Sequence, residues 1–317
     1  MVVMKWVFVI TALVSLLITS ACGTVAPTAL AVLSTPTIAP AISSPLAAQT
    51  ATLPPTSTVI PTSTVAPLNL NPQIDILSEN FVEPDDLLLA PDGSIYISDV
   101  SEGTIKQYTT DGQLNLILSG LRSPEGMAFL PDGTMIIAEQ GTNRLLRYDF
   151  NSKTLTPFLD LVNNTDQLGV DGILWDGSNL IVPDSPNGNV LEVSPDGQTV
   201  RQLASGLARP TGAWLEPSNN LLIADENGNA VYRLHRDGLL EKIGNFSVPD
   251  DVVADASGNI FVATLGDNAI HLLKAGTNQD VVLVSSLNQP QGIIFDQGGN
   301  LIVTDSGNHR LIRVLIH

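Results

Sequence analysis

The chain has 317 residues and carries 32 acidic side chains against 14 basic ones, which gives a formal net charge of −18. Such an acidic protein repels phosphate backbones, so we expect no nucleic-acid partner. The single cysteine excludes an intramolecular disulfide. Every charge except that of Lys5 follows residue 72, where 13 basic and 32 acidic groups leave 13 − 32 = −19.

The first 22 residues predict a signal peptide that ends in a lipidation site. Lys5 precedes an apolar stretch from Trp6 to Ile18, which is the layout of a secretory signal and is short for a membrane span. Thr19-Ser20-Ala21-Cys22 resembles a bacterial lipobox, with Thr19 where a large aliphatic residue is usual. We expect Cys22 to be lipidated and to anchor an extracytoplasmic lipoprotein to the cell membrane or envelope. A free or buried thiol is the alternative.

Residues 23–72 contain no charged side chain and consist mainly of Pro, Thr, Ser, Ala and Val. Such a segment cannot bury a core, so we expect an extended, disordered linker. As a flexible coil its ends would lie roughly 40 Å apart. The sequence therefore predicts a stalk between the lipid anchor and a folded domain over residues 73–317.

The rest of the chain repeats one pattern six times. The copies begin at 39- to 46-residue intervals, at Pro84, Pro124, Val170, Pro210, Pro249 and Pro290. In the second copy, residues 126–130, 134–138, 144–150 and 154–159 read as four short strands separated by turn residues rich in Gly, Asn and Asp. A period of this length is typical of solenoids, propellers and arrays, and four-stranded units favour a propeller.

We therefore predict an all-β, six-bladed β-propeller made of four-stranded antiparallel blades. A parallel β-helix is the alternative, but its rungs are shorter and its turns more regular. The last copy ends after its third strand, and residues 73–78 resemble the strand that is missing there. Pairing these two segments would close the ring and remove two exposed edges, so we expect a monomer.

The repeat also predicts a site, because the residue after each repeated Pro or Val should lie near the mouth of the central channel. Four of these six residues are carboxylates, and oxygen ligands without Cys or His favour Ca²⁺ or Mg²⁺. Alternatively, the acids cap backbone N–H groups or stay separated by water. The predicted metal ligands are Asp85, Glu125, Asp171 and Asp250. The predicted ligand-binding residues are the other two mouth residues, Thr211 and Gln291, together with Arg209.

A second set of acids recurs at the end of the second strand of each copy. Here we expect a structural role, because an acid in the same turn of nearly every blade most simply holds that turn by hydrogen bonds. The set contains Asp99, Glu139, Asp184, Asp225 and Asp305, with Thr264 in the fifth copy.

Two stretches resemble known propeller families. Residues 305–311, Asp-Ser-Gly-Asn-His-Arg-Leu, are close to the NHL repeat pattern, and Pro249-Asp250-Asp251 with residues 255–263 resembles the fifth blade of the gluconolactonase/regucalcin family. The latter resemblance implies a lactone hydrolase with one divalent cation in the channel. By that resemblance Asp250 and Asp85 correspond to acidic ligands, whereas Thr211 stands where the family has Asn.

Two functions follow as hypotheses. The first is a tethered binding module that holds a small ligand or an envelope protein at the acidic mouth, together with a divalent cation. The alternative is a metal-dependent hydrolase of lactones or esters, in which Asp250 or Asp171 activates water. A structural role in the envelope is a third possibility. The one large insertion, residues 162–169, would form a rim or lid.

Overall fold

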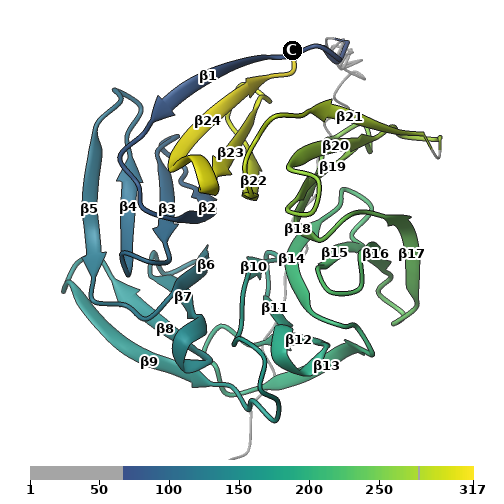
Figure 1. Cartoon of the computed structure of the whole chain (residues 1–317). Helices are drawn as coiled ribbons and strands as arrows, with labels where there is room; N and C mark the ends of the chain where they lie inside the picture. Colours follow the sequence, from purple (N-terminus) through teal and green to yellow (C-terminus); the bar gives the residue numbers. More distant parts are fainter. Residues whose placement is uncertain (1–66, 278) are drawn as a thin grey trace, which may run out of the picture. The chain divides into compact units, whose positions relative to one another are not determined.

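The computed structural model describes residues 67–277 and 279–317. These residues form six four-stranded antiparallel sheets around a central channel, which confirms the predicted six-bladed β-propeller (Figure 1). The predicted signal peptide, Cys22 and nearly all of the predicted linker lie outside the described residues. Within the described part of the chain, no helix has the length and apolar character of a membrane span.

Each blade is a meander of short strands, as the turn residues predict. Blade one contains β2 (Pro84–Leu89), β3 (Ile95–Asp99), β4 (Thr104–Tyr108) and β5 (Leu114–Ser119). Blade two contains β6 (Pro124–Phe129), β7 (Met135–Glu139), β8 (Arg144–Asp149) and β9 (Thr154–Asp160). Blade three contains β10 (Leu174–Trp175), β11 (Leu180–Asp184), β12 (Asn189–Val193) and β13 (Val200–Ser205). Blade four contains β14 (Pro210–Leu215), β15 (Leu221–Asp225), β16 (Ala230–Leu234) and β17 (Leu240–Asn245). Blade five contains β18 (Pro249–Ala254), β19 (Ile260–Thr264), β20 (Ala269–Leu273) and β21 (Asp280–Val284). Blade six contains β22 (Pro290–Phe295), β23 (Leu301–Asp305) and β24 (Arg310–Leu315). Single 3-10 turns follow three of the second strands: η1 (Gln140–Thr142), η2 (Ser185–Asn187) and η3 (Ser306–Asn308).

The ring closes as predicted, because β1 (Gln73–Ser78) pairs antiparallel with β24 and completes the sixth blade. The contact extends into the last residues of the segment predicted as linker. The Asn69 N–H donates to Ile316 O at 2.8 Å, and Leu68 packs against the core of the fifth and sixth blades. Leu68 buries apolar surface there, which explains why the ordered contact begins before residue 73.

The hydrophobic core lies between neighbouring blades. All five residues of the second strand are buried in every blade, because this strand is covered by sheets on both sides. The fully buried side chains include Ile97, Ile137 and Phe261. The apolar runs that identified these strands in the sequence therefore correspond to strands buried on both faces.

The third blade departs from the predicted pattern. Its first strand was expected to start near Val170 like its counterparts, but β10 comprises only Leu174–Trp175. Gly126 of the second blade approaches this segment instead, and its N–H donates to Asp171 O at 3.3 Å. The Asp171 backbone thus bonds to a neighbouring blade rather than to its own sheet.

Candidate functional site in the central channel

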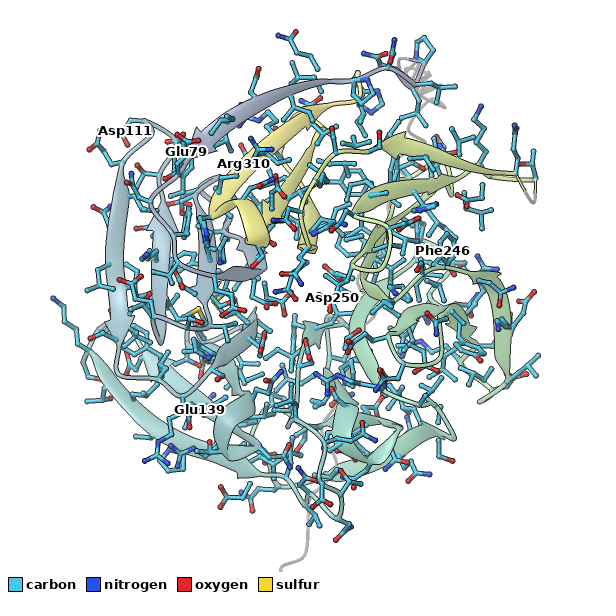
Figure 2. All side chains as sticks on the ribbon, viewed as in Figure 1. Glu79, Asp111, Glu139, Phe246, Asp250 and Arg310 are labelled. Carbon is cyan, nitrogen blue, oxygen red and sulfur yellow. The ribbon has the colours of Figure 1, made fainter. Side chains whose placement is uncertain are left out.

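The six predicted mouth residues surround the channel, but most lie deeper than expected. Asp85, Glu125, Asp171, Thr211 and Asp250 are between 1% and 7% exposed. Figure 2 shows Asp250 at the edge of the channel, whereas Glu139 of the second acidic set lies farther out. The four predicted carboxylates therefore converge in a buried space and not on a solvated rim.

Two further acids, which the sequence analysis did not select, join this group. Asp86 and Asp251 directly follow the mouth residues of blades one and five, and both are half-buried. Carboxylate oxygens of Asp85, Asp86 and Asp171 lie within 4.8 Å of one another. We call the six acids Asp85, Asp86, Glu125, Asp171, Asp250 and Asp251 the channel cluster.

The other four blades have Gly where blades one and five have Asp86 and Asp251. A Cβ on Gly126 would lie 2.4 Å from Ile173 N, and a Cβ on Gly292 would lie 2.6 Å from Asp85 O. These positions require Gly because the neighbouring backbones approach too closely for a side chain. In copies one and five the mouth residue is followed by a second Asp, whereas in the other four copies it is followed by Gly. This difference in the sequence could have indicated the two additional acids.

Crowding and burial disfavour the ionised form of these acids. Burial, followed by the charge of Asp171, raises the pKa of Asp85 well above its usual value, and burial with the same neighbour does so for Asp250. Burial raises the pKa of Asp171 to about 6, although Arg209 opposes the shift. Burial raises the pKa of Asp251 to about 7, although two backbone N–H groups that donate to this carboxylate oppose the shift. At 4 Å and an effective dielectric constant of 20, each close pair of charges costs about 4 kcal/mol.

The donor atoms of the channel cluster suit a hard divalent cation. Glu125 Oε2 is buried and accepts no hydrogen bond from the residues that the structure describes. A buried oxygen without a partner is costly, and a cation would supply the missing interaction. Ca²⁺ and Mg²⁺ both prefer carboxylate oxygens, and all six members of the cluster provide these. The residues present therefore fit the divalent cation that the sequence predicts.

Arg209 lies beside the cluster and is also buried. Its Nη2 lies 2.5 Å from Asp171 Oδ2 and its Nε lies 2.5 Å from Glu226 Oε2. Its Nη1 donates to Leu168 O at 3.4 Å, which links it to the insertion over residues 162–169. In this state the predicted ligand-binding arginine is engaged by protein carboxylates.

The two polar mouth residues differ in what they offer. Thr211 donates from its hydroxyl to Asp250 O at 2.7 Å, so it holds the neighbouring first strand. The half-buried Gln291 donates from Nε2 to Ser306 Oγ at 3.5 Å, its one side-chain hydrogen bond within residues 67–277 and 279–317. The structure brings Thr211 to the cluster as a supporting residue and leaves Gln291 at its periphery.

The insertion forms part of the rim next to Arg209. Asn143 donates from Nδ2 to Leu161 O at 3.0 Å and accepts from Val170 N at 2.8 Å, so one side chain joins both ends of the loop. Val162 and Leu168 are largely exposed on it. The predicted rim is therefore present on the acidic side of the channel.

The second acidic set has the structural role that the repeat predicts. Asp99 accepts from the backbone N–H groups of Val82 and Glu83 at 2.8 and 3.0 Å, and Asp225 accepts from Arg209 N at 2.7 Å. These donors belong to the loops that enter blades one and four, so Asp99 and Asp225 hold those loops. Asp184 instead accepts from Asn187 Nδ2 in its own turn, at 2.9 Å.

Known structures with similar folds include gluconolactonases and a lyase. A candidate gluconolactonase is 20% identical with a TM-score of 0.65, and the match covers 78% of this chain and 92% of that one. A gluconolactonase from Xanthomonas campestris is 14% identical with a TM-score of 0.67, covering 78% and 90%. Virginiamycin B lyase from Staphylococcus aureus is 15% identical with a TM-score of 0.59, covering 78% and 99%. At these identities the likeness shows a shared fold.

The sequence itself places the protein more narrowly. No curated protein matches it. Residues 87–307, which include most of the propeller, match the family described as the SMP-30/Gluconolactonase/LRE-like region. The match includes Glu125, Asp171, Asp250 and Asp251 of the channel cluster and begins just after Asp86. The chain therefore belongs to the SMP-30/gluconolactonase/LRE-like family.

Proposed function

We propose that this protein is a divalent-cation-dependent hydrolase of lactones or related esters. The observation that carries the proposal is the channel cluster, in which oxygens of three carboxylates lie within 4.8 Å of one another and a fourth carboxylate has a buried oxygen with no partner among the described residues. Membership of the gluconolactonase family supports the same chemistry.

Asp85, Asp86 and Asp171 would hold the cation, with Glu125 as an additional ligand. When bound, the cation would polarise the ester carbonyl. Asp250 lies outside the closest three acids, so its carboxylate can take a proton from water at its Oδ atoms. Arg209 and Gln140 fix the orientation of Asp171 through hydrogen bonds of 2.5 and 3.3 Å. Burial of these groups keeps bulk water away from the reacting atoms.

A panel of lactones and aryl esters tests this proposal, assayed with Ca²⁺, with Mg²⁺ and with a chelator. We expect turnover that the chelator abolishes and that Asp250→Asn lowers by a factor of about 10² to 10⁴. Asp111→Asn is the matched control, because this exposed acid lies in a surface turn. Hydrolysis that survives Asp250→Asn would remove Asp250 from the mechanism, and hydrolysis that survives chelation would remove the cation.

One observation favours a second function, cation-dependent binding without catalysis. Thr211 stands where the related family has an amide ligand, and its hydroxyl proton is used on Asp250 O. A hydroxyl is a weaker cation ligand than an amide oxygen, so the site would bind a cation and a ligand without the geometry for turnover. A cation-induced rise in melting temperature with no turnover on the panel would favour this function.

We further propose that Cys22 tethers the propeller to the outside of a cell membrane. The proposal rests on the lipobox-like Thr19-Ser20-Ala21-Cys22 and the uncharged segment after it. Expression of the full chain in a bacterial host, followed by detergent phase partition, tests it. The native chain should enter the detergent phase and Cys22→Ser should stay in the aqueous phase, whereas equal partition of both would contradict lipidation.

A further inference from the structure

A cavity of about 420 Å³ adjoins the channel cluster, with which it shares Asp86 and Asp251, and the proposed hydrolase chemistry uses only Asp86 of its lining. The first strands run from the channel cluster toward this cavity, at about 3.3 Å per residue. Residues of the first-strand segments of all six blades line the space, with Asp251 alone from blade five and with Pro91 from the loop that follows in blade one. We call this space the far cavity. Its volume is within the range of small-molecule sites.

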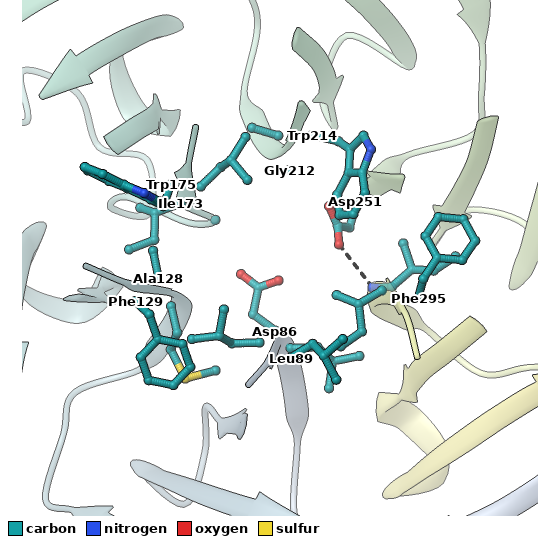
Figure 3. A pocket seen from close by; sticks show the side chains of 18 of the residues that line it. Asp86, Leu89, Ala128, Phe129, Ile173, Trp175, Gly212, Trp214, Asp251 and Phe295 are labelled. Atoms are coloured by element: carbon teal, nitrogen blue, oxygen red, sulfur yellow. Dashed lines mark hydrogen bonds between the residues drawn. The ribbon is translucent and has the colours of Figure 1, made fainter. Parts of the chain in front are cut away.

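The walls of the far cavity are aromatic and aliphatic. Figure 3 shows Phe129, Trp175, Trp214 and Phe295 around the space, with Leu89 and Ile173 among them. Trp214 and Phe295 pack edge to face, with ring centroids 6.1 Å apart. Such walls favour an apolar body and offer ring faces to a cation.

The only ionisable side chains among the described residues that line the far cavity are two acids, Asp86 and Asp251. Figure 3 shows the Asp86 carboxyl group pointing into the middle of the space. Asp251 is fixed, because its Oδ2 accepts from Ile293 N at 3.0 Å and its Oδ1 from Val252 N at 2.8 Å. The Asp86 backbone is held by Ser98 Oγ, which accepts from Asp86 N at 2.9 Å. Both carboxyl groups are therefore presented from a rigid frame.

The excess of acidic groups over basic ones indicates the sign of the ligand, because a bound cation would favour the ionised form of these crowded acids. Six carboxyl groups of the channel cluster face one guanidinium, that of Arg209, within the described part of the chain. A divalent cation held by Asp85, Asp86 and Asp171 would still leave Asp251 of the far cavity without a positive partner among the described residues, and without that cation neither Asp86 nor Asp251 has one. An anionic ligand would be repelled there, and a polyhydroxylated neutral ligand would meet walls that are mostly apolar.

We propose that the far cavity binds an apolar organic cation, of the class of primary alkyl or arylalkyl amines. Its ammonium group donates to Asp86 and Asp251, and its hydrocarbon body packs against Trp175 and Trp214. A bare metal ion is a poor occupant of the outer part of this space, because the apolar walls supply no oxygen ligands.

Trp175 and Trp214 provide a direct signal for the test. Trp6 is the third tryptophan of the chain, so in the full chain carrying Trp6→Phe all tryptophan emission, excited selectively over tyrosine, comes from the two cavity residues. Hexylammonium is titrated in the presence of a chelator, with 1-hexanol and hexanoate as neutral and anionic controls of similar length. We expect saturable fluorescence change with hexylammonium, at least about 10-fold weaker binding of hexanol, and no binding of hexanoate.

The variants Asp86→Asn and Asp251→Asn keep the volume and remove the charge. Each should weaken hexylammonium binding by about 10-fold and leave hexanol binding unchanged. Asp86→Gly is a second variant that restores the residue found in four other blades, and it should have the same effect. Equal affinity for hexylammonium and hexanol, or variants that bind hexylammonium like the parent chain, would overturn the proposal. Because no divalent cation is present, these outcomes do not depend on whether the protein is a hydrolase.

Discussion

Two sets of carboxylates recur around this propeller, and they differ in the partners that surround them. Asp99, in the second set, is fully buried, and its pKa is nevertheless lowered, because two backbone N–H groups and Lys106 outweigh the effect of burial. Asp85, in the channel cluster, is also buried, but its charged neighbours are other acids and its pKa is raised. Burial alone therefore does not distinguish a structural acid from a functional one. The number of hydrogen-bond donors and positive groups around the carboxylate distinguishes the two kinds of acid.

The largest expected effect is on the second set. Asp99→Ala would leave the buried Lys106 without one carboxylate partner and the Val82 and Glu83 N–H groups without acceptors. Loss of one member of a buried pair costs about 3–5 kcal/mol. We expect a decrease of this size in the free energy of unfolding, measured by urea denaturation. A decrease below about 1 kcal/mol would mean that the donors find water, and the contrast between the two sets would be lost.

The pH dependence of stability should come from the channel cluster. The pKa of Asp171 in the folded protein is about 6 and that of Asp251 is about 7, both above the unfolded value of 3.8. Their protonated forms are favoured by folding, so their contribution to stability is complete below about pH 4 and is lost as the pH rises through 6 to 7. In chelator, the melting temperature should fall by several degrees between pH 5 and 8.

Asp251→Asn should reduce this pH-dependent fall, and a saturating divalent cation should suppress it. Asp111→Asn, which alters an exposed turn, should keep the same pH profile as the parent chain. A profile in chelator that stays flat over this range would contradict the crowding of ionisable groups in the channel.

Removing one acid of the channel cluster at neutral pH should raise the free energy of unfolding, a smaller change than that of Asp99→Ala and of opposite sign. Asp250→Asn removes one member of the crowded group while keeping its volume. We expect a gain of about 1–2 kcal/mol in the free energy of unfolding in chelator, together with loss of activity, as is common where a site is destabilised for function. Urea denaturation of the parent and variant chains measures the difference. A destabilised Asp250→Asn would place this residue with the structural acids.

The smallest effect should come from the exposed acids. Asp111→Asn changes the net charge as Asp250→Asn does, but its contacts are local, to Thr109 in its own turn. We expect a change within about 0.5 kcal/mol, measured in the same urea titrations. A larger change would show that net charge, rather than position in the channel, governs stability.

The sequence was sufficient to predict the fold because the same pattern of strands and turns occurs six times. Six copies of one strand pattern predict six blades, and the strand-like residues 73–78 predict ring closure. The irregular start of blade three was not predictable, since it depends on the approach of Gly126 to Asp171 from another blade. The secondary-structure propensity of a short segment does not indicate contacts with another blade.

The site was predictable only in part. Position in the repeat indicated that Asp85 and Asp250 lie near the channel, but it gave no measure of their burial. Asp86 and Asp251 were missed because one residue per copy was considered, although the Gly at the next position in four copies marked them as exceptions. The ion pair of Arg209 with Asp171 joins residues from different blades, and nothing in either local sequence indicates it.

The measurement that tests the central claim most directly is calorimetric titration of the full chain with Ca²⁺ and Mg²⁺ at neutral pH, after treatment with chelator. The account predicts about one divalent cation per chain, release of protons on binding because the channel acids ionise, and loss of binding in Asp85→Asn and Asp86→Asn but not in Asp111→Asn. Absence of binding by either cation, or binding that both channel variants retain, would contradict it.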